Sequence, residues 1–91
     1  MRIVLTYDVN AFHAIIKQIC LNNGFSNCIT LDDGTRRKLP NTTLIGDFES
    51  PGQAVQTFTL LAKRVAPNVV IEKIFASPCP LPWWLDSDER C

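Results

Sequence analysis

One acidic residue, Asp8, stands where α/β proteins commonly place a functional carboxylate. It follows residues Arg2 to Tyr7, a run of β-branched and aliphatic side chains that predicts a strand buried on at least part of both faces. A helical pattern begins directly after Asp8-Val9-Asn10. A carboxylate at the C-terminal end of an inner strand can serve ligand or metal chemistry. The commoner alternative is structural, because an aspartate before a helix also caps that helix or closes a turn.

A second group of candidates is cationic. Arg36-Arg37-Lys38 is the one cluster of adjacent basic residues, and it follows an Asp-Asp-Gly turn on a predicted hairpin arm. Adjacent cations can contact the phosphates of a nucleic acid, and an extended arm can enter a groove. Equally, lysine and arginine protect an exposed sheet edge from aggregation. His13, the single histidine, suits proton transfer, but it has no partner at a useful spacing and is predicted to be a surface residue.

Residues 77–91 differ in character from the rest of the chain. Prolines recur there at every second position from Pro78 to Pro82, which excludes a helix and favours an extended path. The apolar side chains among and after these prolines carry too much area to remain in water. They are Leu81, Trp83, Trp84 and Leu85. We expect this tail to dock on its own domain or across a dimer, with base stacking by the tryptophans as the alternative.

The cysteines show neither a CxxC pair nor a histidine at zinc-finger spacing, so a zinc site is not expected. Two disulfides would suit a secreted protein. The first residues lack the pattern of a signal peptide, so we predict a cytoplasmic protein with free thiols. On this interpretation Cys20 and Cys28 lie in the core, and Cys91 is exposed and able to cross-link molecules in air. The thiol state of Cys79 and Cys91 stays open.

The composition is that of one ordinary globular domain. The chain has 91 residues, of which 46% are hydrophobic and 20% charged. Nine basic and nine acidic side chains cancel, so no global field attracts nucleic acid or a membrane, and any nucleic-acid binding must come from a local patch. No apolar run approaches the ~18 residues of a transmembrane helix. We therefore expect no membrane partner.

The clearest local pattern predicts the start of a helix. Ser50 is a candidate N-cap, Pro51 suits the first helical position, and Gln53 completes a capping box. Apolar residues then follow at helical spacing until the next proline. An earlier helix is predicted over residues 11–23, with Asn10 as its N-cap.

Strands are predicted before, between and after these helices. The four main strands span residues 2–7, 26–31, 42–48 and 69–76, and in the last of them Val69, Ile71 and Phe75 are expected to share one face. The order β-α-β-β-α-β predicts an α+β, ferredoxin-like fold, in which a four-stranded antiparallel sheet carries both helices on one face. Residues 1–76 would form this domain and residues 77–91 its extended tail.

Several short motifs give the chain a family resemblance. The first strand ends in Tyr7-Asp8-Val9, the first helix is closed by Asn-Gly-Phe, and the last strand ends in Phe-Ala. Residues 39–45 look like the stretch that carries a Ser or Thr into a third strand. In these features, residues 1–76 resemble the small CRISPR-associated ferredoxin-like nucleases and relatives such as virulence-associated protein D.

The resemblance implies a site shared between two protomers. In those relatives the aspartate after the first strand pairs with its twin near the dimer axis and holds a divalent metal that activates water against a phosphodiester. Here that role would fall to Asp8 as catalytic residue and as ligand of Mg²⁺ or Mn²⁺. Residues 11–13 and 45–47 depart from the relatives, which have an arginine-rich helix start and a Phe-Glu-Gly at these positions.

Two functions from different classes follow. The first is a small dimeric nucleic-acid-associated protein that binds RNA or DNA through the basic cluster 36–38, with the activity of a metal-dependent nuclease or endoribonuclease of phage-defence or toxin type. The second is a non-enzymatic dimeric module that binds a protein partner through its tail. Loss of metal binding in Asp8→Ala would favour the first, and a changed association state in Trp83→Ala or Trp84→Ala the second.

Overall fold

The computed structural model describes residues 1–79 and 84–91. The predictions made for Pro80, Leu81, Pro82 and Trp83 lie outside these residues. The elements in chain order are β1 (Arg2–Val9), α1 (His13–Leu21), β2 (Phe25–Ser26), β3 (Cys28–Thr30), β4 (Arg36–Lys38), β5 (Thr43–Asp47), α2 (Pro51–Val65) and β6 (Ile71–Pro78). The described part contains no helix that is long and apolar enough to cross a bilayer.

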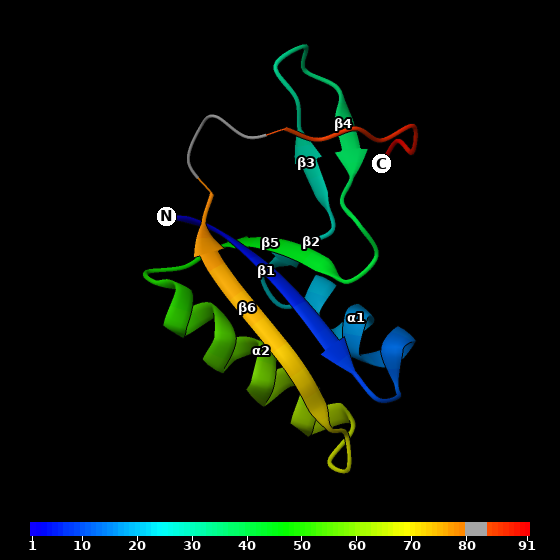
Figure 1. Cartoon of the computed structure of the whole chain (residues 1–91), viewed down its shortest axis with the longest axis vertical. Helices are drawn as coiled ribbons and strands as arrows, with labels where there is room; N and C mark the ends of the chain where they lie inside the picture. Colours follow the sequence, from blue (N-terminus) through cyan, green and yellow to red (C-terminus); the bar gives the residue numbers. More distant parts are fainter. Residues whose placement is uncertain (80–83) are drawn as a thin grey trace.

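The fold is α+β, with two helices, a four-stranded antiparallel sheet and a separate two-stranded sheet. The larger sheet has the strand order β2-β5-β1-β6, and β3 and β4 form the smaller one. Figure 1 shows β3 and β4 as a hairpin that extends away from the larger sheet, with the C-terminal segment passing beside it.

The core lies between the larger sheet and the helices. Along β1, every second side chain from Ile3 to Val9 is buried, and on the opposite face Val4 is half-buried while Thr6 and Asp8 are exposed, so one face is fully covered and the other only in part. Phe58 of α2 is fully buried, and its ring lies 4.5 Å from that of Tyr7 and 6.4 Å from that of Phe25, centroid to centroid. Buried residues of α1 and α2 join this one cluster, so both helices cover the same face of the sheet.

The predicted N-cap of α2 is confirmed. The Ser50 hydroxyl accepts a hydrogen bond of 3.1 Å from the Gln53 N–H, and Pro51 opens the helix. The reciprocal bond differs by one residue from the expected box, because the Gln53 amide oxygen accepts from the Glu49 N–H at 2.7 Å.

The start of α1 differs from the prediction. The helix begins at His13, and Phe12, whose apolar side chain cannot accept a hydrogen bond, occupies the N-cap position with φ 65°. Asn10 does not cap this helix. Its amide oxygen accepts from the Val70 N–H at 2.9 Å and its own N–H donates to the Val70 carbonyl at 3.1 Å, so it joins the end of β1 to the approach to β6.

The predicted second strand is two strands in different sheets. β2 pairs with β5, and after Asn27 the chain leaves the larger sheet to form β3 beside β4. The break lies at Ser26, whose hydroxyl accepts from the Cys28 N–H at 3.1 Å and donates to the Cys28 carbonyl at 3.2 Å. These side-chain bonds compete with the ladder of the larger sheet and turn the chain out of it.

The face assignment for the last strand was wrong for Phe75. In the pairing of β1 with β6, Asp8 is opposite Lys73 and Val9 is opposite Ile71, which leaves Glu72 as an extra residue in a bulge. The bulge shifts the alternation by one position, so Ile71 and Ile74 both pack against the core. Phe75 points to the other face, where 64% of its surface is exposed.

Candidate functional site

Asp8 lies on the open face of the larger sheet. Its side chain is exposed, and the residue opposite it on β6 is Lys73. It is not a helix cap, because α1 starts only at His13. Among the described residues, no three His, Cys, Asp or Glu side chains are grouped to hold a metal ion. A metal at Asp8 would therefore need ligands from substrate, water or a second copy of the chain.

The basic cluster forms β4, whose residues alternate in direction. Arg36 and Lys38 are exposed, whereas Arg37 is half-buried and pairs with the buried Ile29 of β3. Since alternate residues of a strand share a face, Arg36 and Lys38 project together and Arg37 projects to the other side. The predicted triple patch is thus two cations on one face and one on the other.

The turn before β4 is built as the sequence predicts. Gly34 has φ +86°, and the Asp33 carboxylate accepts hydrogen bonds from the Thr35 hydroxyl at 2.6 Å and from the Thr35 N–H at 2.9 Å. These two bonds, with a smaller contribution from the positive charge of Arg37, hold the pKa of Asp33 below its usual value. This carboxylate organises the hairpin.

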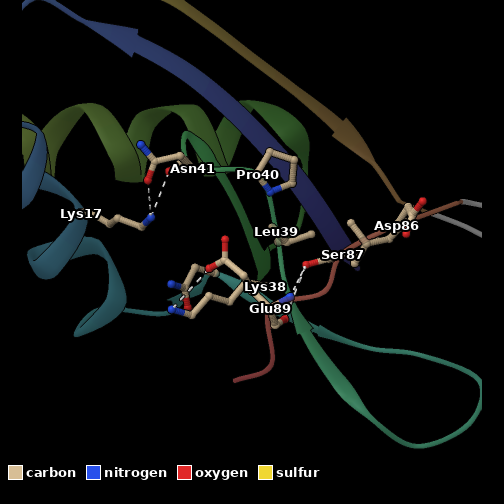
Figure 2. Close-up of a pocket in the computed structure, with 10 residues that line it drawn as sticks. Lys17, Lys38, Leu39, Pro40, Asn41, Asp86, Ser87 and Glu89 are labelled. Atoms are coloured by element: carbon tan, nitrogen blue, oxygen red, sulfur yellow. Dashed lines mark hydrogen bonds and ion pairs between the residues drawn. The ribbon is translucent and has the colours of Figure 1, made fainter.

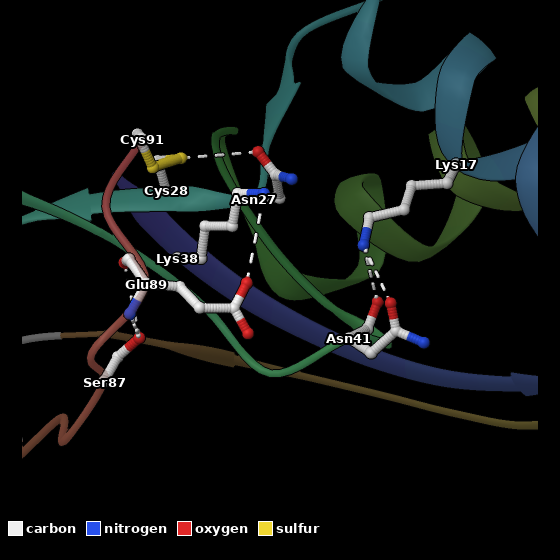
Figure 3. A network of polar contacts seen from close by, with 8 residues as sticks. All are labelled: Lys17, Asn27, Cys28, Lys38, Asn41, Ser87, Glu89 and Cys91. Atoms are coloured by element: carbon white, nitrogen blue, oxygen red, sulfur yellow. Dashed lines mark hydrogen bonds and ion pairs between the residues drawn. A yellow bond between two sulfur atoms is a disulfide. The ribbon is translucent and has the colours of Figure 1, made fainter.

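The C-terminal segment, residues 84–91, occupies the second edge of β4. The Lys38 N–H donates to the Glu89 carbonyl at 3.0 Å, and the Cys91 N–H donates to the Arg36 carbonyl at 3.4 Å. Between these bonds, Arg37 and Arg90 form an antiparallel bridge. The Lys38 ammonium also lies 4.0 Å from the Glu89 carboxylate. Figure 3 shows the segment running beside β4 at this point.

A disulfide fixes this segment to the hairpin. Cys28 of β3 is bonded to Cys91, with Cα atoms 6.3 Å apart and a sequence separation of 63. The prediction of a free thiol was therefore wrong for Cys28, and the thiol state of Cys91, left open by the sequence, is a disulfide, because the fold brings Cys91 beside the strand that carries Cys28. In the described part of the chain, Cys20 and Cys79 remain free thiols. Burial raises the pKa of the Cys20 thiol to about 11, so it is a poor nucleophile near neutral pH.

A polar cleft of about 350 Å³ lies between α1, the β4–β5 connection and the C-terminal segment. Figure 2 shows lining residues from each of these parts and Lys38 from β4. The Lys17 ammonium bonds the carbonyl and the side-chain oxygen of Asn41, at 3.0 and 3.1 Å. Lys38 lines the cleft from β4, and Asp86, Ser87 and Glu89 line it from the C-terminal segment. The cleft thus brings two ammonium groups and an acidic peptide together.

A second cleft continues from the first. It has a volume of about 320 Å³, shares Lys17 and Asn41 with the polar cleft, and is lined further by His13 and Tyr7. Burial, with a smaller contribution from the neighbouring Cys20, raises the pKa of the Tyr7 phenol. The sequence interpretation missed Lys17 and Asn41 as site residues, since Lys17 lies in no motif and Asn41 was considered only as part of the stretch 39–45. The sequence carries no signal for this contact, because the half-burial of Lys17 appears only in the folded structure.

The described tail residues show partial docking. Leu85 is half-buried over an apolar hollow of about 240 Å³ between the open face of the larger sheet and the hairpin. Val4 and Ile45 line its floor. Trp84 lines the hollow's rim with 92% of its surface exposed. The hairpin and the tail therefore cover part of the open face, and a tail-mediated dimer stays a prediction.

Comparisons with protein-family models, with curated proteins and with solved structures returned no match to this chain.

Proposed function

We propose that this chain is a small nucleic-acid-associated protein of ferredoxin-like architecture, whose phosphate-binding element is β4. The strand order β2-β5-β1-β6 supports the proposed fold, because without the β3–β4 hairpin the elements alternate as β-α-β-β-α-β with neighbours in the split order. The chain has no net charge, so contact with a polyanion has to be local.

The observation that carries the proposal is the position of three cationic groups. Arg36 and Lys38 project from the same face of an exposed hairpin strand, and Lys17 lies along the cleft that begins beside Lys38. Separated cations along an extended path suit the repeating phosphates of a nucleic-acid strand, which are contacted without regard to base sequence.

The test is binding of fluorescein-labelled single-stranded RNA to the reduced protein, followed by fluorescence anisotropy over a salt series. Arg36→Ala should weaken binding severalfold and lower the salt slope by about 0.7, the value for one lost phosphate contact with a single strand. Arg64→Ala is the matched control, because it removes the same charge from the last turn of α2. Equal affinities for both variants and wild type, or no binding at all, would refute the proposal.

Metal-dependent phosphodiester cleavage is a second candidate, with Asp8 as catalytic residue and ligand of Mg²⁺ or Mn²⁺. The supporting observation is that the exposed Phe75 lies on the same sheet face as Asp8, which would suit contact with a second copy. Pairing two β6 edges would separate the two Asp8 residues by three strand spacings, about 14 Å. One shared ion needs both carboxylates within about 2.1 Å of it, so this candidate requires dimerisation through the open faces.

A protein-binding module remains the alternative without catalysis. The 92% exposure of Trp84 supports it, since so much aromatic surface is usually kept for a partner. On this proposal Trp84→Ala would change the association state measured by sedimentation, and RNA affinity would be absent.

A further inference from the structure

The C-terminal segment lies on the strand that we propose as the phosphate-binding element. We infer that residues 84–91 form an autoinhibitory strand, locked onto β4 by the Cys28–Cys91 disulfide and released when that bond is reduced. This inference rests on the proposed function, because it describes how the same site is regulated.

The segment blocks β4 through its backbone. Arg36 and Lys38 each use a main-chain group on the outer edge of β4 to bond the segment, and the Arg37–Arg90 bridge lies between them. The other edge of β4 is paired with β3. Because both edges of β4 are occupied, no further strand can pair with it. The segment also lines the cleft beside Lys38 and so limits access of a ligand to its ammonium group.

The segment also resembles the proposed ligand in charge. Asp86, Asp88 and Glu89 place three carboxylates within four consecutive residues, a local density of negative charge like that of phosphates along a nucleic-acid strand. Asp86 and Glu89 line the cleft that contains Lys17 and Lys38, and Glu89 forms an ion pair with Lys38. The Glu89 carboxylate therefore occupies a position at which a phosphate would meet the Lys38 ammonium, and Asp86 lines the same cleft.

The noncovalent contacts alone hold the segment weakly. The Lys38 and Glu89 side chains are 46% and 76% exposed, so solvent and salt screen their attraction. Two backbone bonds, one of them 3.4 Å long, complete the attachment of its last residues to β4. The disulfide keeps the segment at a high effective concentration beside β4, and its loss lets a competing polyanion displace the segment.

The chemical step needs a thiol reductant. A dithiol donates two electrons and two protons, the sulfur–sulfur bond between Cys28 and Cys91 breaks, both cysteines become thiols, and the dithiol closes to its own disulfide. Disulfides persist in oxidising compartments and are transient, often regulatory, where thiols are kept reduced. The fraction of molecules whose β4 is free to bind a nucleic acid would then follow the thiol–disulfide balance of the surroundings.

The first experiment tests release without any nucleic acid. Amide hydrogen exchange would be compared in the oxidised and the dithiothreitol-reduced full chain. The Lys38 N–H, which donates to the segment, should exchange at least tenfold faster after reduction. The Leu39 N–H is the matched control, because it donates to the Asn27 carbonyl at 2.7 Å within the main chain of the domain and should stay protected. Unchanged exchange at Lys38 would overturn the inference whatever the chain binds.

The second experiment measures affinity for the same labelled single-stranded RNA. Reduction or Cys91→Ser should tighten binding at least tenfold, and Cys79→Ser, which leaves the disulfide intact, should behave as wild type in both states. A variant that combines Asp86→Asn, Asp88→Asn and Glu89→Gln tests the charge resemblance with the disulfide kept, and should bind severalfold tighter than wild type when oxidised.

The outcomes separate the two proposals. Tight binding in both redox states would overturn the inference and leave the proposed function standing. Failure of the reduced protein to bind would refute the proposed function, and the inference with it. Circular dichroism of Cys91→Ser should retain the signal of the folded domain, so that a gain in affinity is not mistaken for unfolding.

Discussion

Lys38 and Glu89 are joined twice, once through the backbone and once through their side chains. The Lys38 N–H donates to the Glu89 carbonyl at 3.0 Å, and the Lys38 ammonium lies 4.0 Å from the Glu89 carboxylate. This pair connects a basic strand to an acidic segment 51 positions later in the chain, and the Cys28–Cys91 bond lies beside it. The same contact can therefore stabilise the hairpin and limit the access of a ligand to its cations.

Loss of the disulfide should cost stability. Cys91→Ser opens a loop that spans most of the chain, and for a loop of this length the chain-entropy model gives a loss of about 4 kcal/mol in the free energy of unfolding. Urea denaturation of the variant and of wild type would measure it. Cys79→Ser should change the free energy of unfolding by under ~1 kcal/mol, and an equal loss in both variants would contradict a specific role for the disulfide.

Phe58 should be the most sensitive position of the core. Its ring is fully buried between Tyr7 and Phe25, so Phe58→Ala should lower the free energy of unfolding by about 3–5 kcal/mol. Leu60→Ala on the same helix should cost about 0.5 kcal/mol, since 68% of Leu60 is exposed. Thermal and urea unfolding of both variants would check the contrast, and similar losses would argue against the packing described for α2.

Alkaline pH should destabilise the fold through Cys20. Burial raises the pKa of this thiol to about 11, whereas an unfolded thiol titrates near 9. Between these values the unfolded chain has lost a proton that the folded chain keeps, so stability is complete below pH ~9 and is lost as the pH rises through about 11, by at most about 1.4 kcal/mol per pH unit. Denaturation at pH 8, 9, 10 and 11 should show a smaller slope in Cys20→Ala than in wild type.

Cleavage should depend on Asp8 if the nuclease candidate is correct. Labelled RNA and DNA would be incubated with Mg²⁺ or Mn²⁺, and wild-type cleavage should vanish in Asp8→Asn and on addition of a chelator. Phe75→Lys should also abolish it by preventing contact of the open faces, while circular dichroism stays unchanged. Cleavage that survives in Asp8→Asn would remove this residue from the mechanism.

The sequence predicts those parts of the fold that are set by neighbouring residues. The Ser50–Gln53 cap and the Gly34 turn follow from local hydrogen bonding and backbone conformation. Phe75 was assigned to the wrong face because the bulge at Glu72 depends on how β6 pairs with β1. A one-residue register change moves every following side chain to the other face, and no residue of β6 alone indicates it.

The candidate site was predicted in part. The basic cluster is an exposed strand, as expected. The C-terminal segment beside it could not be predicted, since the two cysteines that join them, Cys28 and Cys91, are 63 positions apart. Which cysteines pair depends on the path of the whole chain, and spacing alone leaves several pairings open. Lys17 and Asn41 meet for the same reason, because the contact forms only when the β4–β5 connection packs beside α1.

The link between Cys28 and Cys91 also determines how the molecule responds to force. A pull applied at Met1 and Cys91 passes from Met1 to Cys28 and then directly across the sulfur atoms to Cys91, so residues 29–90 carry no load. The distance from Met1 to Cys91 should reach only about 100 Å in the oxidised chain and about 300 Å in the reduced chain, at the ~3.5 Å per residue of a stretched backbone. In a single-molecule stretching experiment, β5, α2 and β6 would be mechanically silent until the disulfide is cut.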